Sequence, residues 1–388
     1  MQRIYSIHLK NIVKMSFKFK LFLPFILLLC SVTRSHKLFA QQLNYLFKNG
    51  EDGYTCFRIP SLITTPKGTL LAFAEGRKNN CGDAGDIDLV LKRSEDAGKT
   101  WSKLQIVWDD TTNTCGNPAP VVEKKTGKIV LLSTWNLGSD HEKDIINSTS
   151  KNTRRIFVLS SADDGNTWTG AKEITTDVKK ENWTWYATGP GRGIQLSKGK
   201  HKGRLVIPSN HVVAEIKTNY SHIIYSDDRG STWKLGGITP QDSVNESTVA
   251  DLSNGKLMLN MRNASKKRHR QVAISKDGGE SWSDIHPDTT LMEPVCEANL
   301  LRYKFPGKKE CLLFSNPAST NSRTQMTIRI SYDNGKTWLL KKLVYEGPSA
   351  YSCLTVLPNG NIGFFYEAGL QRPYEGIVFE EISLADFK

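Results

Sequence analysis

Short apolar segments recur along most of the chain, and several lead directly into a small polar turn. A representative segment is Arg155-Ile-Phe-Val-Leu159, which is followed within a few residues by a turn rich in Ser, Asp and Gly. The 30 glycines and nine tryptophans are spread along the sequence, which suits many short strands joined by tight turns. The pattern therefore predicts an all-β protein.

Five of the turns share the form Ser-x-Asp-x-Gly-x-Thr-Trp, with Ser in place of Thr in the fourth. They begin at Ser94, Ser161, Ser226, Ser275 and Ser331. In each, Asp is expected to accept bonds from backbone amides of the turn, and Gly two residues later supplies a positive φ. The start-to-start spacings are 67, 65, 49 and 56 residues, a mean near 59. A four-stranded propeller blade fits this period, so we predict a six-bladed β-propeller whose two chain ends share a blade.

The N-terminus differs from the rest of the chain. Residues 1–20 carry Lys and Arg but no acid, and an apolar run from Leu21 to Cys30 follows. This order is typical of a secretory signal, so we predict a signal peptide at 1–40 and a single propeller domain at 41–388. The run is shorter than the roughly 20 residues that span a bilayer, and no transmembrane helix is expected. An exported protein is predicted (periplasmic, cell-surface or secreted), with lipid attachment at Cys30 as the alternative.

Charge and cysteine content narrow the choice of partner. The net charge of +13 falls to +6 without the seven basic residues of the predicted signal peptide, which suits an anionic substrate and does not call for nucleic acid. Export permits disulfides, so one or more bridges and small buried thiols are both open for the remaining cysteines. No CxxC spacing is present, which disfavours a zinc or redox motif. The six are Cys56, Cys81, Cys115, Cys296, Cys311 and Cys353.

The segment Phe57-Arg58-Ile59-Pro60 resembles the Phe-Arg-Ile-Pro motif of sialidases, and the five turns resemble the Asp-boxes of that family. From this segment onward the resemblance to bacterial-type exo-α-sialidases (neuraminidases, glycoside hydrolase family 33) covers essentially the whole predicted domain. It implies a hydrolase that releases terminal sialic acid with retention of configuration from glycoproteins, glycolipids or oligosaccharides. No cofactor or metal is implied, and a monomer is expected.

The same resemblance assigns a set of arginines to the substrate carboxylate. Arg58, Arg262 and Arg323 match the three arginines of the family. A planar guanidinium holds a carboxylate through two parallel hydrogen bonds, which explains the preference for Arg over Lys. Arg77 is expected to add a further contact.

The catalytic residues implied by the resemblance are Tyr351 as nucleophile, Glu246 as its base and Asp83 as general acid. A carboxylate nucleophile would be repelled by the carboxylate of sialic acid, whereas a neutral tyrosine is not. Asp86 is the alternative to Asp83, and the alternating pattern places Asp88 on a strand.

Two other functions share the fold. A trans-sialidase or intramolecular sialidase would use the same residues, and a non-catalytic glycan-binding propeller would need none of them. The basic run from Lys266 to Arg270 is interpreted as the solvated tip of a hairpin.

Overall fold

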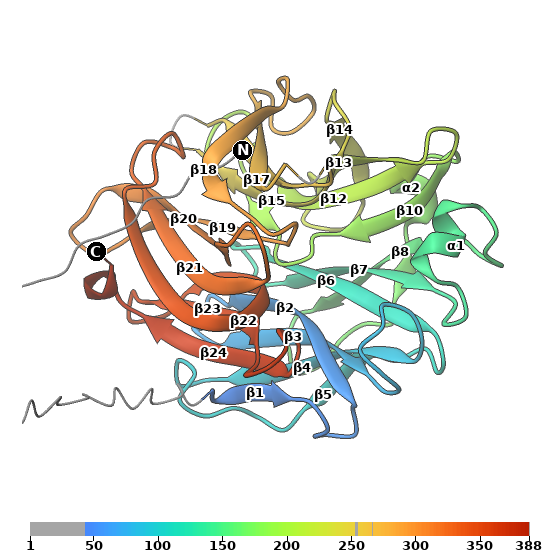
Figure 1. The fold of residues 1–388 in the computed structure, drawn as a ribbon, viewed down its shortest axis with the longest axis horizontal. Helices are drawn as coiled ribbons and strands as arrows, with labels where there is room; N and C mark the ends of the chain where they lie inside the picture. Colours follow the sequence, from blue (N-terminus) through green and yellow to red (C-terminus); the bar gives the residue numbers. More distant parts are fainter. Residues whose placement is uncertain (1–42, 253–254, 266, 388) are drawn as a thin grey trace, which may run out of the picture. The chain divides into compact units, whose positions relative to one another are not determined.

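The computed structural model describes residues 43–252, 255–265 and 267–387 (Figure 1). The predicted signal peptide and Cys30 therefore lie outside the described residues. Strands dominate this part of the chain, which confirms the all-β prediction. They pair antiparallel with their neighbours along the sequence, except at one parallel pair of residues, Ile87 and Thr114.

The strands form successive groups of four. The first comprises β2 (Cys56–Thr64), β3 (Leu70–Arg77), β4 (Ile87–Ser94) and β5 (Gln105–Trp108). The second comprises β6 (Thr114–Val122), β7 (Ile129–Asn136), β8 (Arg155–Ser161) and β9 (Lys172–Glu173). The third comprises β10 (Trp183–Thr188), β12 (Leu205–Val213), β13 (Thr218–Ser226) and β14 (Lys234–Ile238), with β11 (Ile194–Gln195) paired to β12. The fourth comprises β15 (Val244–Asp251), β16 (Leu257–Asn263), β17 (His269–Ser275) and β18 (His286–Met292).

The remaining strands form one longer sheet. It comprises β19 (Asn299–Lys304), β20 (Glu310–Pro317), β21 (Thr324–Ser331), β22 (Leu340–Val356), β23 (Ile362–Ala368), β24 (Gly376–Ile382) and β1 (Tyr45–Lys48). The long strand β22 ends one group of four and begins the next. Because β1 pairs with β24, the prediction that the two ends of the domain share a group is confirmed.

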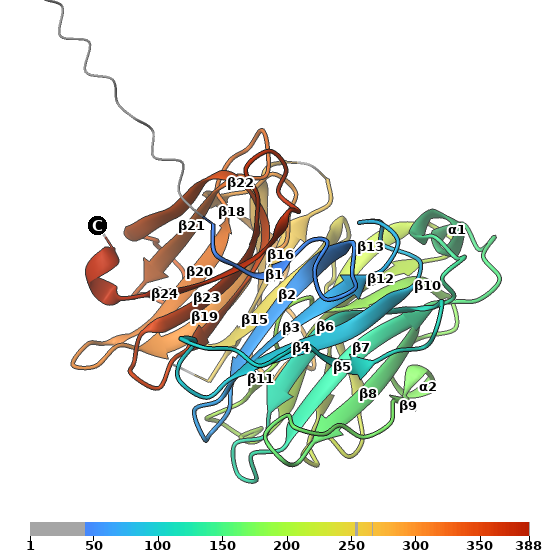
Figure 2. The same ribbon diagram turned by 90° about the horizontal axis from the view of Figure 1, so that it is seen from below.

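The groups follow one another around a common centre, as in a β-propeller (Figure 1). Hydrogen bonds join neighbouring groups at β4–β6 and through β22, so sheet boundaries do not separate every group. Six therefore stays the predicted number of blades. Two short helices, α1 (Glu142–Ile146) and α2 (Thr175–Val178), lie at the periphery beside β10 and β9 (Figure 2), and the 3-10 turn η1 (Leu384–Asp386) ends the described chain. Among the described residues, no helix is long and apolar enough to cross a membrane.

The hydrophobic core lies between adjacent groups. One cluster, for example, combines Ala119 and Leu132 of the second group with Tyr186, Ile207 and Ile224 of the third. Strands near the centre are covered on both faces, and every residue of β3 and β7 is buried. This explains why each begins with an unbroken apolar run, Leu70–Ala74 in β3 and Ile129–Leu132 in β7, rather than an alternating pattern.

The five Asp-boxes connect the third strand of a group to the segment that follows it. In the first, Ser94 Oγ donates to Asp96 Oδ1 (2.8 Å) and accepts from the amide of Gly98 (2.8 Å), while Asp96 accepts from the amide and hydroxyl of Thr100. The other four repeat these bonds. Gly98 has φ +92°, and a Cβ there would lie 2.2 Å from Phe379 of β24, in the neighbouring group. The glycine is thus required both for the turn and for close packing between groups.

Candidate active site

One cavity of about 420 Å³ collects all seven predicted site residues. This volume lies within the range of small-molecule sites. The lining side chains include five arginines and four acids, so the cavity suits an anionic ligand. The predicted residues are Arg58, Arg77, Asp83, Glu246, Arg262, Arg323 and Tyr351.

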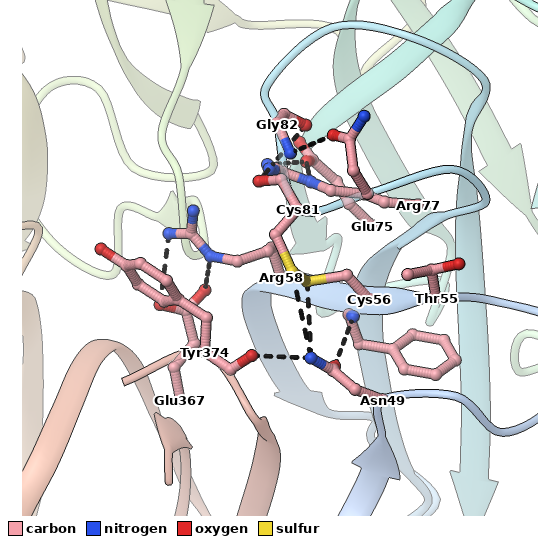
Figure 3. Close-up of a disulfide and its surroundings, with 12 residues drawn as sticks. Asn49, Thr55, Cys56, Arg58, Glu75, Arg77, Cys81, Gly82, Glu367 and Tyr374 are labelled. Atoms are coloured by element: carbon pink, nitrogen blue, oxygen red, sulfur yellow. Dashed lines mark hydrogen bonds and ion pairs between the residues drawn. A yellow bond between two sulfur atoms is a disulfide. The ribbon is translucent and has the colours of Figure 1, made fainter. Parts of the chain in front are cut away.

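Arg58 is held rigidly at the start of β2. Its Nε lies 2.8 Å from Glu367 Oε1 and its Nη2 lies 3.3 Å from Glu367 Oε2. Burial lowers the pKa of Arg58, but the fully buried Glu367 outweighs it and the pKa lies above its ordinary value. The ring of Tyr374 covers the guanidinium at 4.0 Å (Figure 3). One face of the guanidinium is therefore fixed, and Nη1 remains directed at the cavity, 3.8 Å from Asp83.

The other two arginines of the predicted set approach from different groups. Arg262, in β16, donates from Nη1 to Glu246 Oε2 (2.5 Å) and to the hydroxyl of Tyr351 (3.2 Å). Arg323, just before β21, donates to the hydroxyl of Tyr374 (2.6 Å) and to the carbonyl of Val295 (3.0 Å). Tyr374 thus contacts both Arg58 and Arg323, and it fixes the relative orientation of the two guanidinium groups.

Tyr351 and Glu246 form a hydrogen-bonded pair in the lining of the cavity. The Tyr351 hydroxyl donates to Glu246 Oε1 at 2.5 Å. Burial raises the pKa of Tyr351 well above its usual value, and the charge of Glu246 raises it further, against the opposing effects of Arg262 and Arg323. The proton therefore resides on the phenol in the unliganded protein, with an acceptor already in contact.

Asp83 lies on the loop between β3 and β4, beside Arg58 and Arg77. Its carboxylate is 2.8 Å from Arg77 Nη1, and its side chain is 65% exposed. Partial desolvation in the cavity raises its pKa, but Arg77 and Arg58 together lower it below the ordinary value. Asp86 instead pairs with Lys78 at 3.0 Å, and Asp88 is fully buried in β4, where it accepts from the Tyr54 hydroxyl at 2.6 Å.

Several residues that line the cavity or contact its arginines belong to no recognisable sequence motif. Glu367 and Tyr374 contact Arg58 from more than 300 residues away along the chain. Arg154 is 3% exposed, lies over the Trp185 ring at 4.1 Å, and has its pKa lowered to about 10 by burial. Trp185 lies in β10, and nothing in the sequence of that strand identifies Arg154 as its partner.

The basic run from Lys266 to Arg270 is not entirely a solvated tip, and the prediction is wrong for Arg270. This residue lies in β17 with no exposed surface, where it pairs with the equally buried Glu293 at 2.7 Å. Its guanidinium also donates to Asn260 Oδ1 and to the carbonyl of Cys296. The prediction fails because the partner, Glu293, lies just after β18 and is distant in sequence from Arg270. Lys266 itself lies outside the described residues.

The cysteines resolve into both of the predicted classes. Cys56 and Cys81 form a disulfide next to Arg58 (Figure 3), with an S–S distance of 2.07 Å. Cys115, Cys296, Cys311 and Cys353 are buried free thiols. In the part of the chain that the structure describes, no cluster of three or more His, Cys, Asp and Glu side chains is arranged to hold a metal ion.

Known proteins resemble this chain over most of its length. The profile of the BNR repeat-like domain matches residues 68–364. A sialidase of Micromonospora viridifaciens is 33% identical over 351 residues, which cover 87% of this chain and 53% of that protein. A sialidase of Bacteroides fragilis is 34% identical and is covered to 64%, again by 87% of this chain. The chain therefore spans only about half to two thirds of the length of these relatives.

Solved structures of sialidases are also similar to this chain over most of its length. A Hadza microbial sialidase has a TM-score of 0.80 and 32% identity, covering 89% of this chain and 69% of that one. An intramolecular trans-sialidase from Ruminococcus gnavus shares the fold, with a TM-score of 0.74, 19% identity and coverage of 89% and 98%.

Proposed function

The chain belongs to the sialidase family of glycoside hydrolases, and on this premise we propose that it is a retaining exo-α-sialidase acting on terminal sialic acid of glycoconjugates. The observation that carries the proposal is the meeting of three arginines with a Tyr–Glu pair in one cavity. Arg58, Arg262 and Arg323 come from separate groups of strands, yet all line that cavity. A ligand with a single carboxylate on the reacting carbon requires this combination of a cationic clamp and a neutral nucleophile.

The proposed first step forms a covalent intermediate on Tyr351. Its oxygen attacks C2 of the sialoside while Glu246 accepts the phenolic proton, a transfer for which the hydrogen bond between them is already formed. The C2–O glycosidic bond breaks as Asp83 gives its proton to the leaving oxygen. Arg262 contacts both Glu246 and the Tyr351 hydroxyl, so it stabilises the negative charge that develops on the phenol.

The second step reverses these roles. Asp83, now a carboxylate, takes a proton from water, the water oxygen attacks C2, and the C2–tyrosine bond breaks. The phenol recovers its proton from Glu246. Two displacements at one carbon give net retention.

Substrate binding is expected to prepare Asp83 for its role as acid. In the unliganded protein Arg77 and Arg58 hold its pKa below the usual value, which favours the carboxylate. The substrate carboxylate on Arg58 partly neutralises this positive field and brings a negative charge near Asp83. Both effects raise the pKa of Asp83 in the complex and favour the protonated form.

The proposal is tested with a panel of linkage-defined sialosides, by measuring free sialic acid and the anomer first released. We expect α-sialic acid, and a loss of turnover by roughly three orders of magnitude or more in Tyr351→Phe. Trapping with a fluorinated sialoside should add the sugar mass to the peptide that contains Tyr351. Normal turnover in Tyr351→Phe would refute the mechanism, whereas an anhydro-sialic acid product or transfer to added lactose would support the intramolecular or trans-sialidase alternative.

We also propose that the protein is exported. The basic and then apolar N-terminal sequence supports this, and so does the Cys56–Cys81 bridge, since disulfides persist mainly in oxidising compartments. Expression with a C-terminal tag and fractionation should recover the tagged protein outside the cytoplasm and shortened at its N-terminus. A cytoplasmic, full-length product would refute it.

A further inference from the structure

The Cys56–Cys81 disulfide joins the segment of a proposed substrate-binding arginine to the loop of the proposed general acid. Cys56 begins β2 two residues before Arg58, and Cys81 lies on the β3–β4 loop two residues before Asp83. The Asp83 side chain is 65% exposed, and its described partners are the guanidinium groups of Arg77 and Arg58. Its position therefore depends on the path of the loop backbone.

The loop is fixed at the disulfide and just beyond it (Figure 3). Arg77 Nη1 donates to the carbonyls of Cys81 (2.6 Å) and Gly82 (2.9 Å), the two peptide units directly before Asp83. Asn49 lies against the sulfur atoms and donates to the carbonyl of Tyr374 at 2.7 Å. The bridge thus connects the Asp83 loop, β2 and the segment that covers Arg58.

We propose that this disulfide is a positioning element for the general acid, so that the enzyme needs it chiefly for substrates with poor leaving groups. The inference rests on the proposed function. Without the bridge the β3–β4 loop gains conformational freedom, and Asp83 spends less time within reach of the glycosidic oxygen. An alkoxide leaving group needs that proton, whereas an aryl oxide leaves without it.

The test compares kcat/KM for 3′-sialyllactose and for 4-methylumbelliferyl sialoside in the wild type, in Cys56→Ser/Cys81→Ser and in Asp83→Ala. The ratio used is kcat/KM for 3′-sialyllactose divided by kcat/KM for the 4-methylumbelliferyl sialoside. This ratio is independent of the fraction of protein that is folded. We expect the ratio to fall by about tenfold or more in the disulfide variant, in the same direction as in Asp83→Ala, because acid catalysis contributes about 10²–10⁴-fold. Cys311→Ser, the same chemical change at a buried free thiol of β20, should leave the ratio unchanged.

Wild-type enzyme reduced under native conditions gives a second measurement that needs no mutation. A dithiol converts the bridge to two thiols and is itself oxidised to a disulfide, and the ratio should fall as it does in the variant. An unchanged ratio in both, with a clear fall in Asp83→Ala, would overturn this inference alone. An unchanged ratio in Asp83→Ala would instead contradict the proposed role of Asp83.

A second groove lies at the opposite ends of the strands that form the active-site cavity. Asn117 of β6 and Asn210 of β12 line the active-site cavity, whereas Glu123 and Arg204, at the other ends of these strands, line a groove of about 900 Å³. Six residues of extended chain separate Arg204 from Asn210, a span of about 20 Å. The groove is therefore distinct from the proposed catalytic site.

The groove has rigid walls and a cationic rim. Gln195 joins its two sides by accepting from the amide of Lys124 (2.9 Å) and donating to the carbonyl of Gly203 (3.0 Å). Its two acids are already engaged, Glu123 by the Thr126 hydroxyl and Asp227 by Arg204. Among the described residues, no acid pairs with the exposed basic side chains of the rim. These are Lys124, Lys125, Lys200, Lys202 and Arg229.

We infer that this groove binds an acidic polysaccharide, with carboxylate or sulfate groups seated on the rim lysines. Five unpaired cations around a solvent-open groove raise the local concentration of a polyanion, and a chain ligand contacts several of them at once. The buried Leu196 in the lining offers an apolar contact for sugar rings. Such a site would hold the enzyme on an acidic glycan without occupying the catalytic cavity.

The test measures binding of polysialic acid and of heparin to an inactive Tyr351→Phe background. Lys124, Lys125, Lys200 and Lys202 are changed to Gln, and a control changes Lys99, Lys103, Lys308 and Lys309 to Gln, for the same loss of four charges elsewhere. We expect the dissociation constant to rise about 30-fold in the groove variant, the combined effect of four exposed ion pairs, and less than about threefold in the control.

The salt dependence of binding should also become shallower only in the groove variant. Binding of heparin alone would assign the site to sulfated chains, and binding of polysialic acid alone to carboxylated ones. Equal weakening in both variants would show a general charge effect and overturn the inference, as would no binding of either polymer.

Discussion

Removing Arg270 without its partner is expected to destabilise the protein more than removing any exposed charge. Arg270 and Glu293 have no exposed surface and pair at 2.7 Å. Arg270 also donates to Asn260 Oδ1 and to the carbonyl of Cys296, so Arg270→Met leaves a carboxylate and two acceptors without their partner in the interior. Breaking a buried ion pair from one side costs about 3–5 kcal/mol of unfolding free energy.

Replacing both residues separates the cost of an unpaired charge from the cost of lost packing. In Arg270→Met/Glu293→Leu neither charge of this pair remains. The polar losses are the bond that Glu293 accepts from the amide of Asn263 at 2.7 Å and the bonds from Arg270 to Asn260 Oδ1 and to the Cys296 carbonyl. We expect this double variant to lose about 1–3 kcal/mol, less than Arg270→Met alone. The two single changes should therefore be strongly non-additive.

Urea unfolding followed by tryptophan fluorescence measures these differences. The matched control is the exposed pair of Lys48 and Glu51, whose side chains are 56% exposed and lie 3.0 Å apart. The corresponding changes there, Lys48→Met and Glu51→Leu, should cost less than about 1 kcal/mol and add within about 0.5 kcal/mol. Additive losses at Arg270 and Glu293 would refute the account of the buried pair.

Three further outcomes are expected. Arg77→Gln removes the positive charge nearest Asp83, so the pKa of Asp83 rises and the descending limb of the pH profile of kcat/KM should move to higher pH. An unmoved limb would contradict the assigned cause. Tyr374→Phe deletes the hydrogen bond that Arg323 donates to the Tyr374 hydroxyl. KM should rise several-fold, roughly the effect of one charge-assisted hydrogen bond, while kcat changes little. A fall in kcat alone would argue against a role of Tyr374 in substrate binding. Desolvation raises the pKa of Asp228, but hydrogen bonds from Thr232 outweigh it and lower this pKa to about 2. The contribution of its carboxylate to the free energy of unfolding is therefore complete above the unfolded pKa near 4 and is lost as pH falls towards 2. The free energy of unfolding should fall less steeply with acid in Asp228→Asn, and an unaltered curve would exclude this contribution.

Features set by local sequence could be predicted from sequence. All the hydrogen bonds that define an Asp-box lie within eight residues. The spacing between successive Asp-boxes gives the length of the structural repeat. The residues Arg58, Asp83, Glu246 and Tyr351 could be named because the resemblance to sialidases assigns them, even though the chain must fold to bring them together.

The partners of these residues could not be predicted in this way. Glu367 lies within an apolar strand, where its charge makes sense only once Arg58 is known to lie against it. Tyr374 follows that strand on a loop and is indistinguishable by pattern from any surface tyrosine. The prediction for Arg270 is wrong for the same reason: local charge density indicates solvent, and its partner Glu293 lies 23 residues away, just after β18. Long-range pairing carries no periodic signal in one sequence.

The pairing of β1 with β24 makes completion of the domain depend on its last strand to be synthesised. Tyr45 is registered with Val378, so at roughly 5–20 residues per second the first strand waits on the order of 17 to 70 s for its partner. Until then the nascent domain has two unpaired sheet edges, which are sites for aggregation. A chain truncated before Gly376 keeps all proposed catalytic residues, the last of which is Tyr351. It nevertheless lacks β24, the strand with which β1 pairs. A polypeptide that ends before β24 is therefore expected to keep β1 as an unpaired sheet edge.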